Sequence, residues 1–338
     1  MNKHYFRKSL VLKCLFFVFV SLGLVVGSVA HIHAQEVHFT QFDYNPLFVN
    51  PANTGNFKGD FRVAANYRNI SEQYRTASFS IENQFYVLNQ NIGAGLFVLN
   101  DESGILGMNH NKIYGSVGYG KVISNNYIGL GIQAGFVFGG VNDYKIFDYS
   151  TGGFTLPSGE PTSLKASYLD INLGLVYKRS ISIFEPEVGI SFGHLNRPNP
   201  SFYDSGDEKL DLLSLGYTTI KTNISDKIYI TPKILVLAKP ADLSTVYGAE
   251  LGYNVIGNRS TVKRIFAGMY ISSGDLTTMN FISVQAGATV SRFDLAINYD
   301  VLSTLPSSNS KIGTIEIAFI FRSISTVLNS YSIPCERF

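Results

Sequence analysis

Bulky apolar residues alternate with polar or small residues along much of the chain. From Arg292 to Val301, every second residue is apolar and large, and most of the positions between are charged or polar. The segments 127–138 and 168–178 repeat this pattern. Because successive side chains of a β-strand point to opposite faces, this period of two predicts strands with one apolar face.

Similar segments recur from about residue 60 to about residue 322, and Gly, Asn, Asp, Ser and Pro residues separate them. No long amphipathic helical pattern lies between them. We therefore predict an all-β chain with fourteen strands. The predicted strands span residues 60–67, 76–84, 91–99, 111–122, 127–138, 167–177, 187–195, 212–220, 228–238, 245–253, 264–272, 282–290, 293–301 and 314–321.

The lengths of the connections distinguish between two β architectures. A soluble β-sandwich also alternates, so the period alone leaves a sandwich and a membrane barrel open. The odd-numbered connections include the long 139–166 and 196–211, whereas the even-numbered ones include the tight 291–292. Outer-membrane barrels have short turns in the periplasm and long loops outside. The asymmetry predicts a transmembrane antiparallel β-barrel of about 14 strands.

The composition agrees with a lipid-facing surface. Charged residues make up 15% of the chain and aromatic residues 13%, whereas a soluble surface normally carries more charge. Several tyrosines fall near predicted strand ends, where a membrane barrel carries an interfacial aromatic girdle, although tyrosine is also common in strands generally. The candidate girdle residues are Tyr127, Tyr168, Tyr177, Tyr229, Tyr253 and Tyr299.

The N-terminus predicts secretion. Four basic residues precede an apolar run over residues 14–30, and Ala34 follows a short polar stretch. This order is typical of a cleaved signal peptide, and a retained membrane anchor is the alternative. We expect the cell outer membrane as the location. The predicted division is a signal peptide at 1–34, an N-terminal periplasmic or plug segment at 35–59, the barrel at 60–322 and a C-terminal tail at 323–338.

The net charge argues against nucleic acid as a partner, and the cysteine content excludes an intrachain disulfide in the mature chain. Without residues 1–34, the chain carries 23 basic and 25 acidic residues, so no overall basic surface for nucleic acid is expected. Cys335 is the one cysteine that remains, so the mature chain cannot form an intrachain disulfide.

The sequence offers little for catalysis. After signal removal, the histidines are His38, His110 and His194, which are far apart and show no metal-ligand spacing with Cys335 or with carboxylates. There is no Gly-rich phosphate loop before a helix. We therefore predict no catalytic, metal-binding or cofactor-binding residues. His194 is interpreted as a rim residue bonded to backbone, and Asp170 and Asp300 as solvated residues of the inner wall.

The segment 38–55 does not fit the barrel pattern. It contains two Asn-Pro pairs, which favour extended or turn backbone and cannot lie inside a paired central strand. Its aromatic residues imply docking, either within the barrel mouth or on a partner, and a structural plug is the other interpretation. The candidate partner-docking residues are Phe39, Phe42, Tyr44, Asn45, Pro46, Asn50 and Pro51.

Short motifs in a fixed order resemble the PorP/SprF family of the Bacteroidota type IX secretion system. They cover the chain from about residue 37 to the end. The motifs are His38-Phe39-Thr40-Gln41-Phe42, Asn45-Pro46-Leu47, Asn50-Pro51-Ala52, Gly55, Tyr67-Arg68-Asn69, Asp101 with Gly104, Tyr168-Leu169-Asp170, His194-Leu195-Asn196-Arg197-Pro198-Asn199, Tyr299-Asp300 and Cys335-Glu336-Arg337-Phe338. Two positions depart from the family pattern. Ile70-Ser71-Glu72 stands where a Trp often occurs, and Ile315-Glu316 replaces a His-Glu pair.

The resemblance implies a non-enzymatic outer-membrane barrel without cofactors that helps to export or retain particular cell-surface proteins, in some members gliding adhesins. Its implied partners are outer-membrane lipid, the C-terminal domains of secreted proteins and other components of the type IX system. From the residues alone, a passive channel or porin is the alternative, because the inward faces are polar. A lipid-modifying enzyme would need a nucleophile and a base that the motifs do not supply.

Overall fold

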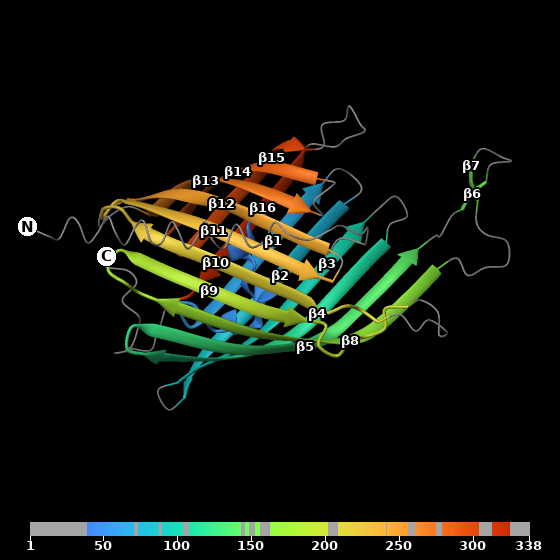
Figure 1. Cartoon of the computed structure of the whole chain (residues 1–338), viewed down its shortest axis with the longest axis horizontal. Helices are drawn as coiled ribbons and strands as arrows, with labels where there is room; N and C mark the ends of the chain where they lie inside the picture. Colours follow the sequence, from blue (N-terminus) through green and yellow to red (C-terminus); the bar gives the residue numbers. More distant parts are fainter. Residues whose placement is uncertain are drawn as a thin grey trace, which may run out of the picture.

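The chain folds into one closed β-barrel in the computed structural model (Figure 1). The structure describes residues 39–70, 74–87, 90–103, 108–142, 146–148, 153–155, 163–201, 209–240, 242–255, 261–274, 279–303 and 313–324. Fourteen strands form the barrel, all pairs are antiparallel, and the first strand pairs with the last. The predicted fold class is confirmed. The predicted signal peptide and Cys335 lie outside the described residues.

Each predicted strand has an observed counterpart. The barrel strands are β1 (Phe61–Ile70), β2 (Tyr74–Val87), β3 (Gln90–Ser103), β4 (Met108–Ile123), β5 (Asn126–Asn142), β8 (Ser163–Arg179), β9 (Phe184–Gly193), β10 (Leu213–Asn223), β11 (Ile228–Lys239), β12 (Asp242–Asn254), β13 (Val262–Gly274), β14 (Met279–Val290), β15 (Phe293–Ser303) and β16 (Thr314–Arg322).

Several strands are longer than predicted. β5 and β8 have 17 residues each and pair from Asn126 with Arg179 to Asn142 with Ser163. The predicted loop 139–166 is therefore partly strand. Backbone pairing between the two strands continues beyond the last apolar residues that face outward. There the sequence no longer alternates between apolar and polar residues, so it does not predict a strand. Two short strands, β6 (Ile146–Asp148) and β7 (Gly153–Thr155), pair only with each other and lie beyond the barrel end (Figure 1).

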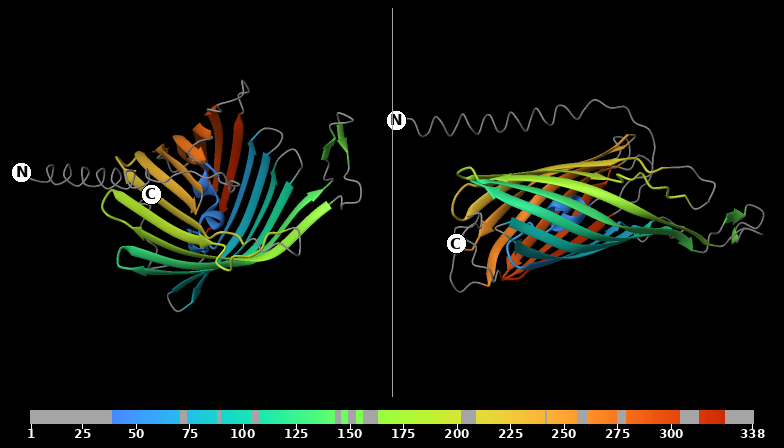
Figure 2. Two further views of the ribbon diagram at one scale, coloured as in Figure 1. Left: turned by 45° about the vertical axis from the view of Figure 1, so that its right-hand side comes forward. Right: turned by 90° about the horizontal axis from the view of Figure 1, so that it is seen from below.

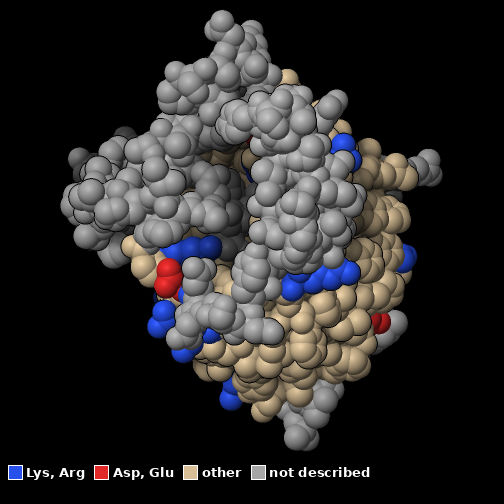
Figure 3. Space-filling view, turned by 90° about the vertical axis from the view of Figure 1, so that its right-hand side faces the viewer, with Lys and Arg blue, Asp and Glu red and all other residues tan. Residues whose placement is uncertain are grey.

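The apolar face of the strands points outward. On β15, Ile297 is 58% exposed, whereas its neighbours Ala296 and Asn298 are buried. On β5, Leu130 and Phe136 are likewise exposed. Most of the described surface in Figure 3 belongs to neither Lys and Arg nor Asp and Glu. Such a surface matches the hydrocarbon layer, and every barrel strand pairs within the closed sheet, as backbone in lipid requires. Among the described residues, no helix is long and apolar enough to cross a membrane.

The predicted tyrosine girdle is wrong for half of its members. Tyr177, Tyr253 and Tyr299 are exposed on the outside, in agreement with the prediction. Tyr127 and Tyr229 are buried inside the barrel, and Tyr168 packs against an internal cluster. The strand period explains the difference for Tyr127, because it shares the inward face with Gly129 and Gly131 of the same strand.

The two ends of the barrel differ. The loop rim is the end with the connections 143–162, 194–212 and 304–313, and the turn rim is the end with the shorter connections such as 124–125 and 291–292. In outer-membrane barrels, short turns face the periplasm. The plug, residues 39–59, lies inside the barrel and forms short helical turns, drawn in blue in Figure 2.

Candidate functional site

The plug contains all seven predicted docking residues, and all seven are buried inside the barrel. The largest exposed fraction among Phe39, Phe42, Tyr44, Asn45 and Asn50 is 4%. Their side chains therefore contact the barrel wall. Binding of a partner through this segment stays a prediction.

The two Asn-Pro pairs start short helical turns. Pro46 begins α2 (Pro46–Val49), and Pro51 begins η2 (Pro51–Asn53). Proline fits the first helical position because its missing N–H needs no partner there. The Asn50 side chain accepts a hydrogen bond from Ala52 N at 2.8 Å and so caps η2. A third turn, η1 (Phe42–Tyr44), precedes both. The sequence places these turns where prolines exclude a strand.

The plug aromatics pack against aromatic residues of the wall. Phe42 lies 6.2 Å from Tyr217 and Tyr44 lies 6.4 Å from Phe266, measured between ring centroids. Phe39 packs edge-on against Phe48 at 5.5 Å, within the plug. Burial, together with the nearby negative charge of Asp43, raises the pKa of Tyr44 well above its usual range. Its ring is therefore held as a neutral phenol.

An ion pair clamps the start of the plug in the loop-rim half. Glu316 of β16 accepts hydrogen bonds from Thr40 N at 3.0 Å and Gln41 N at 2.8 Å. Arg68 of β1 lies directly opposite Glu316 and pairs with it at 3.2 Å. Arg68 also donates to the Thr40 hydroxyl at 3.2 Å. Sequence reasoning noted both residues as motif positions but did not predict their contact with the plug.

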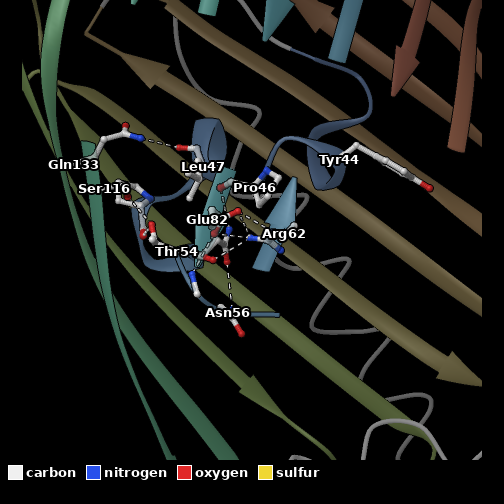
Figure 4. Close-up of polar contacts among 12 residues, drawn as sticks. Tyr44, Pro46, Leu47, Thr54, Asn56, Arg62, Glu82, Ser116 and Gln133 are labelled. Carbon is white, nitrogen blue, oxygen red and sulfur yellow. Dashed lines mark hydrogen bonds and ion pairs between the residues drawn. The ribbon is translucent and has the colours of Figure 1, made fainter. Parts of the chain in front are cut away.

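A second ion pair clamps the end of the plug near the turn rim. Arg62 of β1 and Glu82 of β2 form a bidentate pair, with hydrogen bonds of 2.8 and 3.0 Å. Glu82 accepts from Gly55 N at 3.1 Å, and Arg62 donates to Asn53 O at 3.1 Å. Figure 4 shows this pair beside the plug. Because both partners are buried, each charge is stabilised only while the pair is intact.

A third cluster joins the plug to the opposite wall. Lys233 of β11 donates to Asp43 of the plug at 2.7 Å and to Glu250 of β12 at 2.8 Å. The Tyr229 hydroxyl donates to the other oxygen of Glu250 at 2.9 Å. The plug is therefore fixed by charges on both sides of the barrel.

Buried amides add further contacts. Asn45 donates to the Ser78 hydroxyl at 2.7 Å. Asn50 donates to the backbone carbonyls of Leu175 at 2.9 Å and Ile190 at 3.2 Å, which face each other on β8 and β9. Gln133 donates to the carbonyl of Leu47 at 3.4 Å (Figure 4). Asn45 and Asn50 were predicted to dock on a partner or in the barrel mouth, and here they bind the wall.

A row of four glycines forms the surface under the plug. Gly93, Gly118, Gly131 and Gly174 lie on the adjacent strands β3, β4, β5 and β8, and each is in direct register with the next. A Cβ atom on any of the four would collide with plug residues 50–55. The wall thus admits the plug only because these positions have no side chain. The sequence predicted small residues on the inward face, but it does not give the register between strands. It therefore could not predict that the four glycines lie side by side.

The inner wall near the loop rim holds a buried acid and histidine. His194 Nδ1 lies 2.9 Å from one oxygen of Asp170, and the Tyr114 hydroxyl donates to the other at 2.6 Å. His194 was interpreted as a rim residue hydrogen-bonded to backbone, but its ring bonds to the Asp170 carboxylate. Asp170 was interpreted as solvated, and this is wrong because it is buried. Asp300, also interpreted as solvated, is buried and accepts from the Ser283 hydroxyl at 2.5 Å. Closure of the barrel around the plug removes water from all three residues.

Ser191 lies beside this acid–histidine pair, in the sequence Gly189-Ile190-Ser191-Phe192-Gly193, which has the G-x-S-x-G spacing but belongs to strand β9 and not to a strand-to-helix turn. The nearby Ser191 hydroxyl donates to Val49 O at 2.8 Å. No group of three or more His, Cys, Asp or Glu residues is arranged for a metal ion within the described ranges. The Asp170–His194 bond joins β8 to the residue that follows β9.

A cavity of about 400 Å³ lies between the plug and the turn rim. Asn125 and Ser180, which belong to turns at that rim, line its mouth. The plug residues Phe42, Tyr44 and Phe57 form part of its inner surface. Its volume is that of a small binding site.

The fold and the plug together define a class, the outer-membrane β-barrel whose lumen is filled by its own chain. A similar fold occurs in the Pseudomonas putida toluene transporter TodX, with TM-score 0.51, 10% identity, and coverage of 81% of this chain and 92% of that chain. The Ralstonia pickettii toluene transporter TbuX gives TM-score 0.45 and 10% identity, with coverage of 82% and 93%. At this identity, the TodX likeness concerns the fold alone.

The family follows from the sequence. A family model described as "Type IX secretion system membrane protein PorP/SprF" matches residues 32–321. The chain therefore belongs to the PorP/SprF family of type IX secretion system membrane proteins. A search of curated proteins finds no match.

Proposed function

We propose that this protein is a non-enzymatic outer-membrane component that supports export or surface retention of particular secreted proteins, such as gliding adhesins. Its family belongs to the type IX secretion system. The observation that carries the proposal is the plug, which three ion-pair clusters hold across the lumen. A barrel filled in this way is suited to holding partners at its rims and is poorly suited to passing solutes.

The loop rim is the proposed site for the cargo. The two longest connections, 143–162 and 194–212, both leave the barrel there. A secreted protein that emerges on the cell surface would meet this rim first if the short turns face the periplasm. We propose that these connections bind the C-terminal domain of the cargo, while the turn rim faces other components of the secretion system.

Deletion of residues 144–161 tests the cargo site. This deletion removes most of one long connection but leaves the pairs between β5 and β8 intact up to Asn142 and Ser163. We expect the variant to insert normally and to release surface cargo into the medium. Deletion of residues 305–312, in another loop-rim connection, is the matched control and should leave retention unchanged. Full retention after the first deletion would contradict the assignment of this loop.

The non-enzymatic part of the proposal rests on the family, which is of a kind not known to be catalytic. The buried Asp170–His194 pair is the group that a lipid-modifying activity would have to use. Purified protein in phospholipid micelles should release no fatty acid above background. Release that is abolished by His194→Ala would make the protein an enzyme and would overturn this part.

A further inference from the structure

The last strand delivers the C-terminal chain to the edge of the turn-rim cavity. Ile320 and Arg322 of β16 both line this cavity. The next residue is fixed to the start of β1, because the Ser323 hydroxyl accepts from Asp60 N at 2.8 Å and Phe61 N at 2.9 Å. Gly59, at φ +118°, allows the close approach, since a Cβ there would meet Ser323 O. The chain after Ile324 therefore starts beside the cavity mouth.

The cavity carries a surplus of positive charge. Its basic lining residues are Arg62, Lys178, Arg179, Lys221, Lys233, Arg264 and Arg322. Its acidic lining residues are Asp43, Glu185, Glu187, Glu250 and Asp294. Within the described ranges, most of the basic residues have an ion-pair partner, for example Lys178 with Glu187 at 2.7 Å.

Two cations account for the surplus. Lys221 and Arg179 have no carboxylate within ion-pair distance among the described residues. Lys221 Nζ instead lies 5.1 Å from the ring centroid of Tyr229, on the cavity wall. A half-buried ammonium over an aromatic ring is a favourable place for an incoming carboxylate, because the ring and the wall already exclude water from one side.

The C-terminal segment 325–338 has the chemistry to fill the cavity. It contains the apolar or aromatic residues Val327, Leu328, Tyr331, Ile333 and Phe338. Its charged residues are Glu336 and Arg337, and Glu336 supplies the carboxylate. The cavity offers the rings of Phe42, Tyr44, Phe57, Tyr217 and Tyr229. The twelve residues from Ser325 to Glu336 reach up to about 40 Å when extended. Because Arg322 and Lys221 line the same cavity, this length is more than sufficient.

We propose that the turn-rim cavity is the binding site of the chain's own C-terminal segment 325–338, with the Glu336 carboxylate paired to the Lys221 ammonium. The covalent link keeps the segment at a high effective concentration beside the cavity, so weak contacts suffice for occupancy. This inference is independent of which cargo the loop rim holds.

Disulfide trapping of Cys335 tests the proposal in the full-length chain. In a Cys14→Ser background, Cys335 is the one native thiol. Thr219→Cys and Thr231→Cys place a second thiol in the cavity wall. Lys227→Cys is the matched control, on an exposed turn of the same rim outside the cavity lining. After reduction and mild oxidation in detergent, we expect an intramolecular disulfide at one or both cavity positions, formed at least about tenfold faster than in the control.

Charge exchange separates specific binding from chance collision. Glu336→Gln or Lys221→Gln should slow trapping about threefold, the size expected for a partly exposed ion pair. The double exchange Lys221→Glu with Glu336→Lys should restore it. Retention of the heat-sensitive gel mobility of a folded barrel shows that the variants fold. Trapping that is no faster than in the control, or disulfides formed only between chains, would overturn the proposal and would leave the cavity to a segment of another protein.

Discussion

Glu316 accepts a hydrogen bond from the backbone of Gln41 at 2.8 Å, although 275 residues separate them. The contact exists because β1 and β16 close the barrel and place Arg68 opposite Glu316. Closure of the sheet and binding of the plug thus use the same pair of charges. The stability of the barrel and the occupancy of its lumen should therefore change together.

Glu316→Gln should loosen the start of the plug. The variant removes the closer of the two carboxylates that pair with Arg68, leaving Asp300 at 3.8 Å, and puts an amide against two N–H donors. We expect a loss of about 3–5 kcal/mol in the free energy of unfolding, as is typical when one partner of a buried pair is removed. Urea unfolding in detergent measures it. Glu102→Gln, an exposed position on β3, is the control. Equal midpoints for the two variants would contradict the clamp.

Gly131→Val should displace the plug without removing any bond of the wall. The added side chain occupies the space of Pro51 and Ala52. We expect residues 50–55 to become accessible to protease in a correctly inserted barrel. The control is Gly216→Ala, because no atom lies within 4 Å of a Cβ at that glycine. If the first variant is as resistant as the second, the glycine row does not position the plug.

Ile297→Arg tests whether lipid covers the outer face. Ile297 is 58% exposed near the middle of β15. A charge at the bilayer midplane costs about 2–4 kcal/mol, and near the interface about 0–1 kcal/mol. Ile123→Arg, at the end of β4, should therefore be much less destabilising. Folding into phospholipid bilayers gives both values, and a harmless Ile297→Arg would argue against a membrane-facing surface.

Alkaline pH should weaken the plug through Tyr44. Burial raises the pKa of this phenol in the folded protein, whereas an unfolded tyrosine titrates near pH 10. The stability from neutral Tyr44 is therefore complete below about pH 10 and falls as the pH rises further. Tyr44→Phe should lose less stability than the wild type between about pH 9 and pH 11. If the urea midpoints of the wild type and of Tyr44→Phe change in parallel with pH, this role of Tyr44 is contradicted.

The sequence predicted the strands and their faces well because a period of two is a local signal. Ile297 outside and Asn298 inside follow directly from alternation along one strand. The same rule, applied to Tyr127, would have placed it inside. The strand ends were missed where pairing continues beyond the apolar band, as at Asn142.

The contacts of the plug could not be predicted in the same way. The pair of Arg62 and Glu82 depends on the register between β1 and β2, and the glycine row depends on the register of four strands. A single sequence gives residue types on each face but not their lateral alignment. The burial of His194 against Asp170 was missed for the same reason.

The conductance of the isolated wild-type barrel in a planar lipid bilayer tests the central claim most directly. The plug, held at Glu316, Glu82 and Lys233, should keep the lumen closed, so we predict no stable current after insertion. Glu316→Gln and Gly131→Val should raise the frequency of openings. A large, steady current through the wild-type protein would show an open pore and would contradict a barrel that works by docking.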